Sequence, residues 1–266
     1  MKPSTGNKFL AKFKNTMIAL ITGATAGIGM ACAKKFAAKN YNLILTGRRK
    51  ERLEELKKEL ENNYAIGVVT LSFDIQNKEE VQVALDSLDN AWNRIDVLVN
   101  NAGLALGKEG FQDANLEDFE VMLDTNVKGL LYVAKWVVNG MKERKAGHVI
   151  NLSSTAAKEV YPGGHVYCAS KHAVDAITKG MRIDLLPFNI KVSSVSPGMV
   201  DTEFSKVRFG GDQAKADAVY QGFTPLYAED VADAIYYLAS LPKHVNVNDL
   251  VMTCTAQANS YITFKE

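Results

Sequence analysis

The sequence predicts a protein of the α/β class, built as a single domain around a doubly wound parallel sheet of about seven strands with helices on both faces. Short apolar runs that favour strands alternate with longer helical patterns, as is typical of parallel sheets joined by crossover helices. The first apolar run leads directly into a glycine-rich turn. No linker, repeat or low-complexity stretch divides the 266 residues, a length that suits one large domain.

Local patterns predict each element in order. Apolar, strand-like runs predict strands at 17–22, 43–46, 66–73, 97–100, 148–152, 192–196 and 250–253. Helical patterns predict helices at 27–39, 50–63, 77–92, 116–144, 165–186 and 228–240, of which 50–63 is charged, amphipathic and rich in Glu and Lys. Helices thus fill the gaps between strands, as a doubly wound sheet requires.

Two stretches stand apart from this alternation. Residues 1–15 form an N-terminal lead-in with four lysines and no acid, and residues 16–266 form the single domain. Residues 198–226 contain Gly210-Gly211, many polar residues and a short helical pattern around 212–221. They follow a strand end, where doubly wound sheets place their ligands. We expect this segment to cover the substrate, and an ordinary surface excursion is the alternative.

Composition excludes several classes of function. The chain is 47% apolar and 23% charged, with a net charge of +1, which gives no argument for binding nucleic acid or an anionic membrane. No apolar run approaches the roughly 20 residues that span a bilayer. Cys32, Cys168 and Cys254 are widely spaced and form no CxxC pair. We therefore expect no metal site and no disulfide scaffold, and a reducing, cytoplasmic setting.

The glycine-rich turn at residues 22–29 predicts a dinucleotide site. Gly23 permits a tight turn, and Gly27 and Gly29 let the backbone approach a pyrophosphate and let the helix pack on the strand. The following helix presents unpaired N–H groups to the anion at its N-terminus. Because this turn lies between a predicted strand and a predicted helix, it indicates a Rossmann-type arrangement.

The end of the second predicted strand indicates which dinucleotide binds. An NAD site usually offers a carboxylate to the ribose hydroxyls, but residues 43–50 contain no acid and include Arg48 and Arg49. Two guanidinium groups favour a 2′-phosphate by charge and by geometry. Cations at a helix start are also unfavourable to the helix dipole, so a bound phosphate accounts for them better than solvation does. We therefore predict NADP.

A tyrosine and a lysine four residues apart predict the chemistry. Tyr167 and Lys171 lie on the predicted helix 165–186, where side chains at i and i+4 share one face. A free tyrosine has a pKa near ~10, and a neighbouring ammonium lowers it. The phenol can then exchange a proton with an alcohol near neutral pH. Ser154 lies thirteen residues before Tyr167.

Together these residues resemble the short-chain dehydrogenase/reductase family over nearly the whole chain. The matching motifs are TGxxxGIG at 22–29, Asn-Asn-Ala-Gly at 100–103, Asn126, Ser154, the pair Tyr167 and Lys171, and Pro197-Gly198 followed by Asp201-Thr202. Their number, order and spacing make the resemblance specific.

The resemblance implies a role for each of these residues. Tyr167 is the expected general acid and base, Lys171 holds the nicotinamide ribose, Ser154 bonds the substrate oxygen, and Asn126 holds a water that links Lys171 to solvent. The implied cofactor contacts are Gly23, Thr25, Ala26, Gly27, Ile28, Gly29, Arg48, Arg49, Asp74, Ile75, Asn101, Ala102, Gly103, Tyr167, Lys171, Pro197, Gly198, Val200 and Thr202. The implied substrate contacts are Ser154 and Tyr167.

A narrower resemblance concerns residues 101–107, 202–209 and 224–226, which are similar to the NADP-dependent serine or 3-hydroxy acid dehydrogenase branch. This branch oxidises the 3-hydroxyl of serine, L-allo-threonine and related 3-hydroxy acids, and its members are usually homotetramers. A carboxylate substrate needs a cation, and Arg208 is the candidate by forked recognition. A solvated surface arginine is the alternative for Arg208.

Two other functions are weighed against this one. A 3-oxoacyl thioester reductase shares every core motif, and only the segment after Gly198 separates it from the 3-hydroxy acid branch. A non-catalytic NADP-sensing regulatory protein retains the fold but commonly lacks the tyrosine or the lysine. This chain keeps Asn126, Ser154, Tyr167 and Lys171, and we therefore expect an enzyme acting on a small 3-hydroxy acid.

Overall fold

The central feature of the fold is a parallel sheet in which the chain adds strands first on one side of β1 and then on the other. A computed structural model describes residues 16–266, so the predicted lead-in at 1–15 lies outside the described residues. The seven strands follow the order β3-β2-β1-β4-β5-β6-β9, and every neighbouring pair is parallel. Their bounds are β1 (Ile18–Ile21), β2 (Asn42–Gly47), β3 (Val68–Ser72), β4 (Val97–Asn100), β5 (Gly147–Leu152), β6 (Ile190–Pro197) and β9 (Asp249–Met252).

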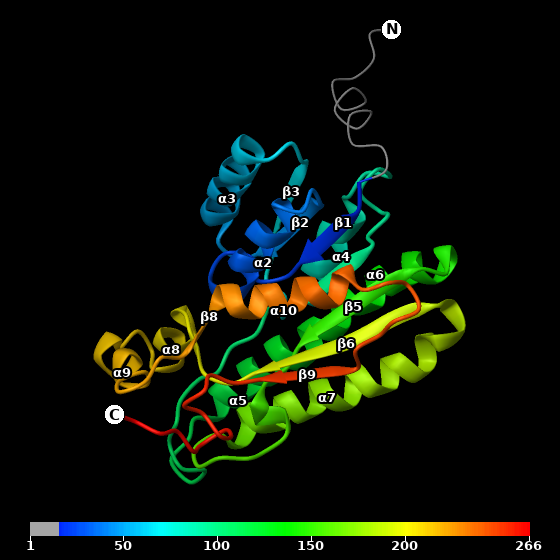
Figure 1. Cartoon of the computed structure of the whole chain (residues 1–266). Coiled ribbons are helices and arrows are strands. Elements are labelled where there is room, and N and C mark those ends of the chain that lie inside the picture. The colour runs from blue at the N-terminus through cyan, green and yellow to red at the C-terminus, as the bar shows by residue number, and fades with distance from the viewer. Residues whose placement is uncertain (1–15) are drawn as a thin grey trace, which may run out of the picture.

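Helices cover both faces of this sheet, as Figure 1 shows. The helices α2 (Gly27–Ala37), α3 (Lys50–Asn63) and α10 (Ala228–Ser240) supply one hydrophobic cluster. The helices α4 (Lys78–Asp86), α6 (Leu130–Arg144) and the C-terminal part of α7 (His165–Leu185) supply the second. The predicted α/β class, with a single doubly wound sheet of about seven strands, is confirmed.

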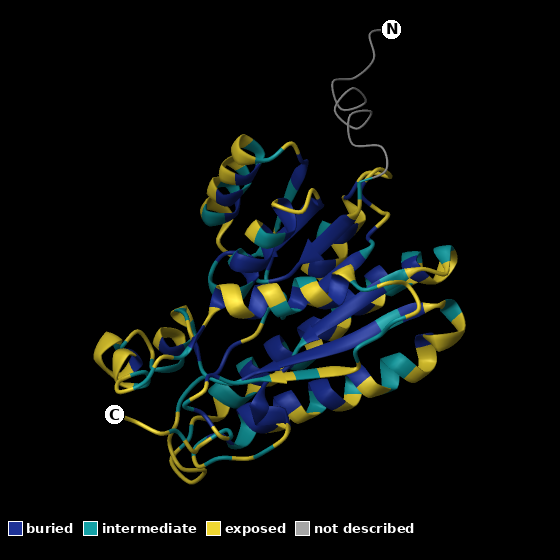
Figure 2. Cartoon of the chain, in the orientation of Figure 1, coloured by how far each residue is buried: buried dark blue, intermediate teal, exposed yellow. Residues whose placement is uncertain are grey.

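The strands contribute alternate residues to the two clusters. In β1, Ala19 and Ile21 belong to the cluster under α2 and α10, whereas Ile18 and Leu20 belong to the other. This alternation follows from the two-residue period of a strand. All four are buried, which explains why parallel strands covered on both faces appear in the sequence as continuous apolar runs. Figure 2 shows the sheet strands largely buried between helices whose outer sides are exposed.

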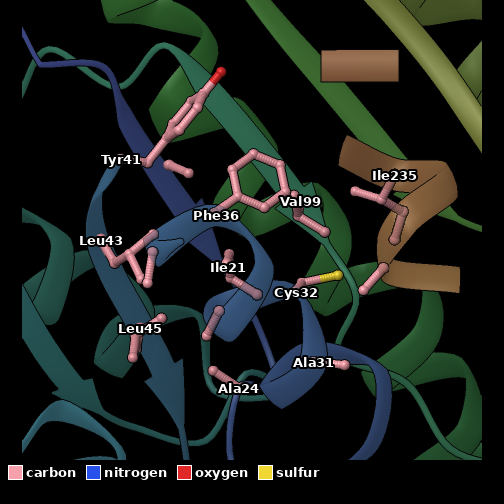
Figure 3. Packing of buried hydrophobic residues seen from close by; sticks show 14 of the residues in the cluster. Ile21, Ala24, Ala31, Cys32, Phe36, Tyr41, Leu43, Leu45, Val99 and Ile235 are labelled. Atoms are coloured by element: carbon pink, nitrogen blue, oxygen red, sulfur yellow. The ribbon is translucent and has the colours of Figure 1, made fainter. Parts of the chain in front are cut away.

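Phe36 of α2 is a centre of packing on the α2 and α10 side (Figure 3). Its ring makes an edge contact with Tyr41 at a centroid distance of 4.9 Å. In the close-up it lies near Val99 of β4, and Ile235 of α10 borders the same cluster. Burying a side chain of this size contributes roughly 1.5–3 kcal/mol. This packing fixes α2, and therefore its N-terminal glycine turn, against the sheet.

Two predicted helices differ from those observed. The predicted helix 116–144 contains α5 (Leu116–Leu123), a π-helical turn at Asp124–Gly129 and α6. Tertiary contacts accompany this turn, since Asn126 bonds the backbone of Leu104 on both its N–H and its carbonyl. The predicted helix 77–92 ends at Asp86, where the Ser87 hydroxyl donates to the carbonyl of Ala84 at 2.6 Å.

Residues 198–226, called here the covering segment, lie beyond the carboxyl end of β6 (Figure 1). The segment begins with β7 (Val200–Asp201), which pairs in parallel with β8 (Leu226–Tyr227). Between these strands lie α8 (Glu203–Arg208) and α9 (Gln213–Ala218), the latter inside the predicted helical pattern 212–221. Thr202 caps α8 by accepting a hydrogen bond from the N–H of Phe204.

Candidate active site

A cleft of about 360 Å³ opens among the segments that follow the carboxyl ends of the sheet strands. Doubly wound sheets bind ligands at this edge, where the strand order reverses. The predicted site residues that line it are Gly23, Thr25, Ala26, Gly27, Ile28, Arg48, Arg49, Asp74, Ile75, Asn101, Ala102, Gly103, Ser154, Tyr167, Lys171, Pro197, Gly198, Val200 and Thr202. The structure therefore brings together nineteen residues from seven separate stretches of the chain.

Three predicted site residues lie outside this lining, namely Gly29, Asn126 and Arg208. Gly29 has a packing role, because a Cβ there would overlap the carbonyl oxygen of Gly23 and lie 2.5 Å from Asn101 Nδ2. Asn126 and Arg208 both contact loops that border the cleft. The roles predicted for these two residues stay predictions.

The glycine turn and the loop after β4 are joined by Thr22. Its hydroxyl oxygen accepts hydrogen bonds from the N–H of Asn101 at 3.0 Å and of Ala102 at 2.9 Å. Asn101 Nδ2 donates back to the Thr22 carbonyl at 2.8 Å. Gly23 has a φ of 66°, and a Cβ there would lie 3.0 Å from the Ala102 backbone. The close approach of these two loops therefore requires a glycine at position 23.

The two arginines after β2 have different surroundings. The Arg48 side chain is 61% exposed, and its Nη1 lies 3.7 Å from Asp74. Arg49 donates from Nε and Nη2 to the Thr25 hydroxyl at 3.1 and 2.8 Å, and from Nη1 to Glu203 at 2.9 Å. Hydrogen bonds from Arg49, and secondarily from Arg52, lower the pKa of Glu203. Both arginines line the cleft, but only Arg48 has a largely unpaired guanidinium.

Tyr167 and Lys171 point into the same cleft from one face of α7. The Lys171 amine lies 5.9 Å from the centroid of the Tyr167 ring and donates to the carbonyl of Leu152 at 3.0 Å. Both side chains are buried. At this separation an ammonium favours the phenolate of a neighbouring tyrosine. The predicted juxtaposition of phenol and amine is therefore present.

Burial acts strongly on both groups. Burial raises the pKa of Tyr167, because a phenolate is disfavoured away from water, while Ser154 and the Arg208 charge act in the lowering direction. Burial lowers the pKa of Lys171 to about 8. Such opposed shifts in a cleft are typical of functional sites.

Two serines at the end of β5 line the cleft beside Tyr167. The hydroxyl of Ser154 accepts a hydrogen bond from the N–H of Ala156 at 3.1 Å and donates to the Pro197 carbonyl at 3.5 Å. It thereby caps the short helical turn Thr155–Ala157. The Ser153 hydroxyl is buried and has no hydrogen-bond partner among residues 16–266. Spacing from Tyr167 selected Ser154, and the structure places both hydroxyls at the cleft.

Asn126 lies behind the cleft in the π-helical turn. Its Oδ1 accepts from the N–H of Leu104 at 2.8 Å, and its Nδ2 donates to the Leu104 carbonyl at 2.8 Å and to Ser170 at 3.0 Å. A Cβ on Gly103 would lie 3.1 Å from Asn126 and 3.5 Å from the Lys171 amine. Asn126 thus fixes the loop after β4 close to Lys171, which fits the functional use often made of π-helical turns.

Arg208 of α8 joins two loops, the one that contains Gly107 and the one that contains Tyr161 and Gly163. Its guanidinium donates to the Gly107 carbonyl at 3.0 Å, to the Tyr161 hydroxyl at 2.9 Å and to the Gly163 carbonyl at 3.4 Å. It also lies 5.8 Å from the centroid of the Tyr167 ring. Arg208 therefore places a positive charge near the predicted catalytic tyrosine, although it is not part of the cleft lining.

Sequence reasoning missed several residues that line the cleft, and local signals existed for some of them. Glu203 and Phe204 of α8 lie four and three residues before Val207, so each is its neighbour on the helix surface. Thr125 precedes the predicted Asn126, and its hydroxyl is buried without a hydrogen-bond partner in the described part of the chain. The complete missed set is Thr46, Gly47, Phe73, Gln76, Leu104, Thr125, Leu152, Ser153, Glu203, Phe204 and Val207.

The residues of the cleft fit a phosphorylated dinucleotide. A glycine turn lies at the N-terminus of α2, and Arg48 provides an exposed guanidinium. Buried polar groups are nearly always paired, so the unpartnered hydroxyls of Thr125 and Ser153 in the lining are suited to polar groups of a ligand. No group of three or more His, Cys, Asp or Glu side chains within residues 16–266 is arranged to hold a metal ion.

Other described features bear on the remaining expectations. None of the helices between residues 16 and 266 has the length and apolar character needed to cross a membrane. Cys32, Cys168 and Cys254 are all buried free thiols.

Comparison with known proteins identifies the class to which this fold and site belong. The short chain dehydrogenase family model matches residues 17–212. The chain therefore belongs to the short-chain dehydrogenase family, as its motifs predicted. Within that family several relatives are similar over almost the whole chain.

Three similar proteins illustrate these relationships. Sulfoacetaldehyde reductase 2 of Chromohalobacter salexigens is 49% identical over 242 residues, covering 91% of this chain and 95% of that protein. The NADP-dependent 3-hydroxy acid dehydrogenase YdfG of Escherichia coli K12 is 46% identical over 243 residues, covering 91% and 96%. The closed form of serine dehydrogenase complexed with NADP+ is 44% identical, with a TM-score of 0.88 over 94% of this chain and all of that one.

Proposed function

We propose that this chain catalyses hydride transfer between NADP and C3 of small 3-hydroxy acids such as serine and L-allo-threonine, or reduces the matching 3-oxo acids. Its membership of the NADP-dependent short-chain dehydrogenases that act on hydroxyl groups is confirmed by its relatives. The observation that carries the proposal is the meeting of Tyr167, Lys171 and Ser154 in a cleft that also contains the glycine turn and Arg48.

NADP, when bound, supplies the nicotinamide carbon that accepts the hydride from C3 of the alcohol. Tyr167, as phenolate, takes the hydroxyl proton of the same substrate, so that a carbonyl forms as the proton and the hydride leave. Ser154 donates to the substrate oxygen, and Lys171 holds the cofactor ribose while its charge favours the phenolate. Proton transfer by a positioned group of this kind contributes about 10²–10⁴-fold.

The charges near Tyr167 support the proposed substrate class. Arg208 lies 5.8 Å from the Tyr167 ring, and Lys108 lies close enough to Arg208 for the two charges to interact. Three of the five guanidinium N–H groups of Arg208 are donated to protein oxygens, which leaves one on Nη1 and one on Nη2 for a carboxylate approaching end-on. A small substrate with an anionic group near its reacting carbon fits this arrangement.

The reduction of a small sulfonated aldehyde is the second candidate function. One relative with 49% identity is a sulfoacetaldehyde reductase. In sulfoacetaldehyde the anionic sulfur is one methylene from the aldehyde carbon, as the carboxylate carbon is in malonic semialdehyde. The same cation near Tyr167 would therefore serve either anion.

A screen of both reaction directions tests these proposals. NADP reduction is followed with serine, L-allo-threonine, 3-hydroxypropionate and 3-hydroxyisobutyrate, and NADPH oxidation with malonic semialdehyde and sulfoacetaldehyde, with NAD and NADH run in parallel. We expect turnover of several 3-hydroxy acids with NADP. Sulfoacetaldehyde turned over far faster than every 3-oxo or 3-hydroxy acid would favour the second candidate, and turnover of none of these compounds would refute both.

The remaining expectations become part of the same proposal. We propose that residues 16–266 form the catalytic domain, that the covering segment closes over the substrate, and that the enzyme is a cytoplasmic homotetramer. Retention of Asn126, Ser154, Tyr167 and Lys171 argues against a non-catalytic NADP sensor. A 3-oxoacyl thioester reductase would turn over acyl thioesters in preference to free acids, which the same assay can measure.

A further inference from the structure

Glu203, at the start of α8, connects the covering segment to two arginines at the cofactor end of the cleft. Its carboxylate accepts from Arg49 Nη1 at 2.9 Å and from Arg52 Nη1 at 2.9 and 3.0 Å. Arg49 is the residue directly before α3, and Arg52 lies in the first turn of α3. More than 150 residues separate Glu203 from either arginine in sequence. The contact therefore exists only because the fold brings the covering segment over this edge.

Arg49 extends the connection to the glycine turn. Two of its three guanidinium nitrogens donate to the Thr25 hydroxyl, and the third donates to Glu203. Thr25 itself is wedged against β2, since a Cβ on Gly47 would lie 2.8 Å from its methyl group. We call the chain of Thr25, Arg49, Glu203 and Arg52 the clasp.

A second contact lies beside the clasp. A Cβ on Gly27 would lie 3.2 Å from Thr202, the residue that caps α8. Gly27 belongs to the turn predicted to approach the pyrophosphate. The covering segment therefore rests directly on the glycine turn at Thr202 and is tied to it at Glu203.

Arg48 takes no part in the clasp. Its side chain is 61% exposed, and its ion-pair partner is Asp74 at 3.7 Å. Among the two arginines that the sequence offers to a 2′-phosphate, Arg48 is the one whose fork of N–H groups is free for bidentate recognition.

We propose that the two arginines have separate tasks: Arg48 recognises the 2′-phosphate of NADP, whereas Arg49 holds the covering segment on the glycine turn through Glu203. Glu203 is then a positioning residue for cofactor binding. The proposal rests on the proposed use of this cleft for NADP and is independent of which substrate is turned over. Charge alone would assign recognition of the 2′-phosphate to both arginines, whereas the proposal assigns it to Arg48 only.

For a variant that removes the charge of Glu203, the clasp and a simple field effect predict opposite changes in dinucleotide affinity. Removing the negative charge of Glu203 makes the cleft more positive, so a field effect alone would tighten the binding of an anionic dinucleotide, and of NADPH more than NADH. Loss of the clasp instead releases the covering segment from the pyrophosphate region that both dinucleotides share. The clasp therefore predicts weaker binding of both, by the same factor.

The experiment measures the Kd of NADPH and of NADH by nicotinamide fluorescence for the full-length wild type and four variants. Glu203→Gln and Arg52→Gln interrupt the clasp, and Arg52 is not part of the cleft lining. Arg48→Gln removes the proposed 2′-phosphate contact. Lys206→Gln changes the charge of α8 at an exposed side chain outside the clasp and serves as the control. Thermal melting of each variant confirms that it is folded.

Expected results differ between the two kinds of variant. Because the charged side chains of the clasp, Arg49, Arg52 and Glu203, are 43–46% exposed, each ion pair contributes modestly. We therefore expect both Kd values to rise about three- to tenfold in Glu203→Gln and in Arg52→Gln. Their ratio should stay as in the wild type. In Arg48→Gln the preference for NADPH over NADH should fall by tenfold or more, with the Kd of NADH unchanged. Hydrogen exchange of residues 203–218 should become faster in Glu203→Gln.

Three results would overturn the proposal. Tighter NADPH binding by Glu203→Gln would mean that Glu203 only competes with the phosphate for Arg49. Unchanged Kd values in both clasp variants would mean that the contact has no effect on the cofactor. An unchanged NADPH preference in Arg48→Gln would place the phosphate elsewhere. Wild-type protein that binds neither dinucleotide would instead refute the proposed function, and the clasp with it.

Discussion

Replacing Lys171 by methionine should change how the stability of the protein depends on pH. Lys171 is 5% exposed, and burial lowers its pKa from the ordinary 10.5 to about 8. Between these two values the unfolded chain holds a proton that the folded chain has released. Stability therefore rises with pH across this window, because the unfolded state binds more protons. At pH 7 both states are protonated, and the full cost of the buried charge applies.

The magnitude follows from the size of the shift. A difference of about 2.5 pKa units corresponds to roughly 3 kcal/mol at 1.36 kcal/mol per unit. Between pH 7 and pH 10 the wild type should gain about 2.5 kcal/mol of unfolding free energy relative to Lys171→Met. The lost hydrogen bond to the Leu152 carbonyl shifts the variant by a constant amount, so it does not enter this difference.

Urea unfolding at several pH values between 7 and 10, on protein without dinucleotide, measures the effect. Val174→Ala provides the control, since Val174 is fully buried on the same helix and does not titrate. Its truncation should lower stability by about 1–3 kcal/mol at every pH. If the stability of Lys171→Met follows the wild type in parallel from pH 7 to pH 10, the amine is not perturbed by burial and the reasoning fails.

Three further predictions concern the proposed activity and the glycine turn. Tyr167→Phe should lower kcat by at least about two orders of magnitude with little change in the Kd of NADPH; near-normal turnover would refute the assignment. Gly29→Ala should destabilise the fold by about 1–3 kcal/mol and weaken NADPH binding, because its Cβ would overlap Gly23. Gly180→Ala is the comparison: a Cβ there meets nothing within 4 Å, so this variant should stabilise helix α7 by about 0.5–1 kcal/mol. Arg208→Lys should raise KM for serine but not for an uncharged alcohol, and an equal rise for both would assign Arg208 a purely bracing role.

The parts of the fold that local chemistry determines could be predicted from the sequence. The central strands β1 and β4 are buried on both faces, so their apolar runs are continuous, whereas the edge strands β3 and β9 are partly exposed. The glycine turn could also be predicted, because the positive φ of Gly23 and of Gly27 can be adopted readily only by a residue without a Cβ. Tyr167 and Lys171 share a helix face by spacing alone, and the structure places both at the cleft.

Features that depend on distant contacts could not be predicted in this way. The π-helical turn at Asp124–Gly129 accompanies hydrogen bonds between Asn126 and a loop 22 residues earlier. Glu203 appears in the sequence as an ordinary acid in the first turn of a short helix. Its two arginine partners lie more than 150 residues earlier in the chain. The division between Arg48 and Arg49 likewise depends on what the covering segment contacts. Such pairings belong to the tertiary structure, and no local period encodes them.

The electrostatics of Tyr167 connect the predicted tyrosine with the unexpected bracing of Arg208. Burial disfavours charge on both Tyr167 and Lys171, so a neutral phenol beside a neutral amine is the state that burial alone favours. Moving one proton from Tyr167 to Lys171 leaves the pair uncharged overall, and the surrounding charges then decide where the proton resides. Arg208, held 5.8 Å from the ring by Gly107, Tyr161 and Gly163, stabilises the phenolate whether or not it touches a substrate. The arginine that joins these two loops would thus also favour the ionised form of the Tyr167 phenol that the proposed reaction needs.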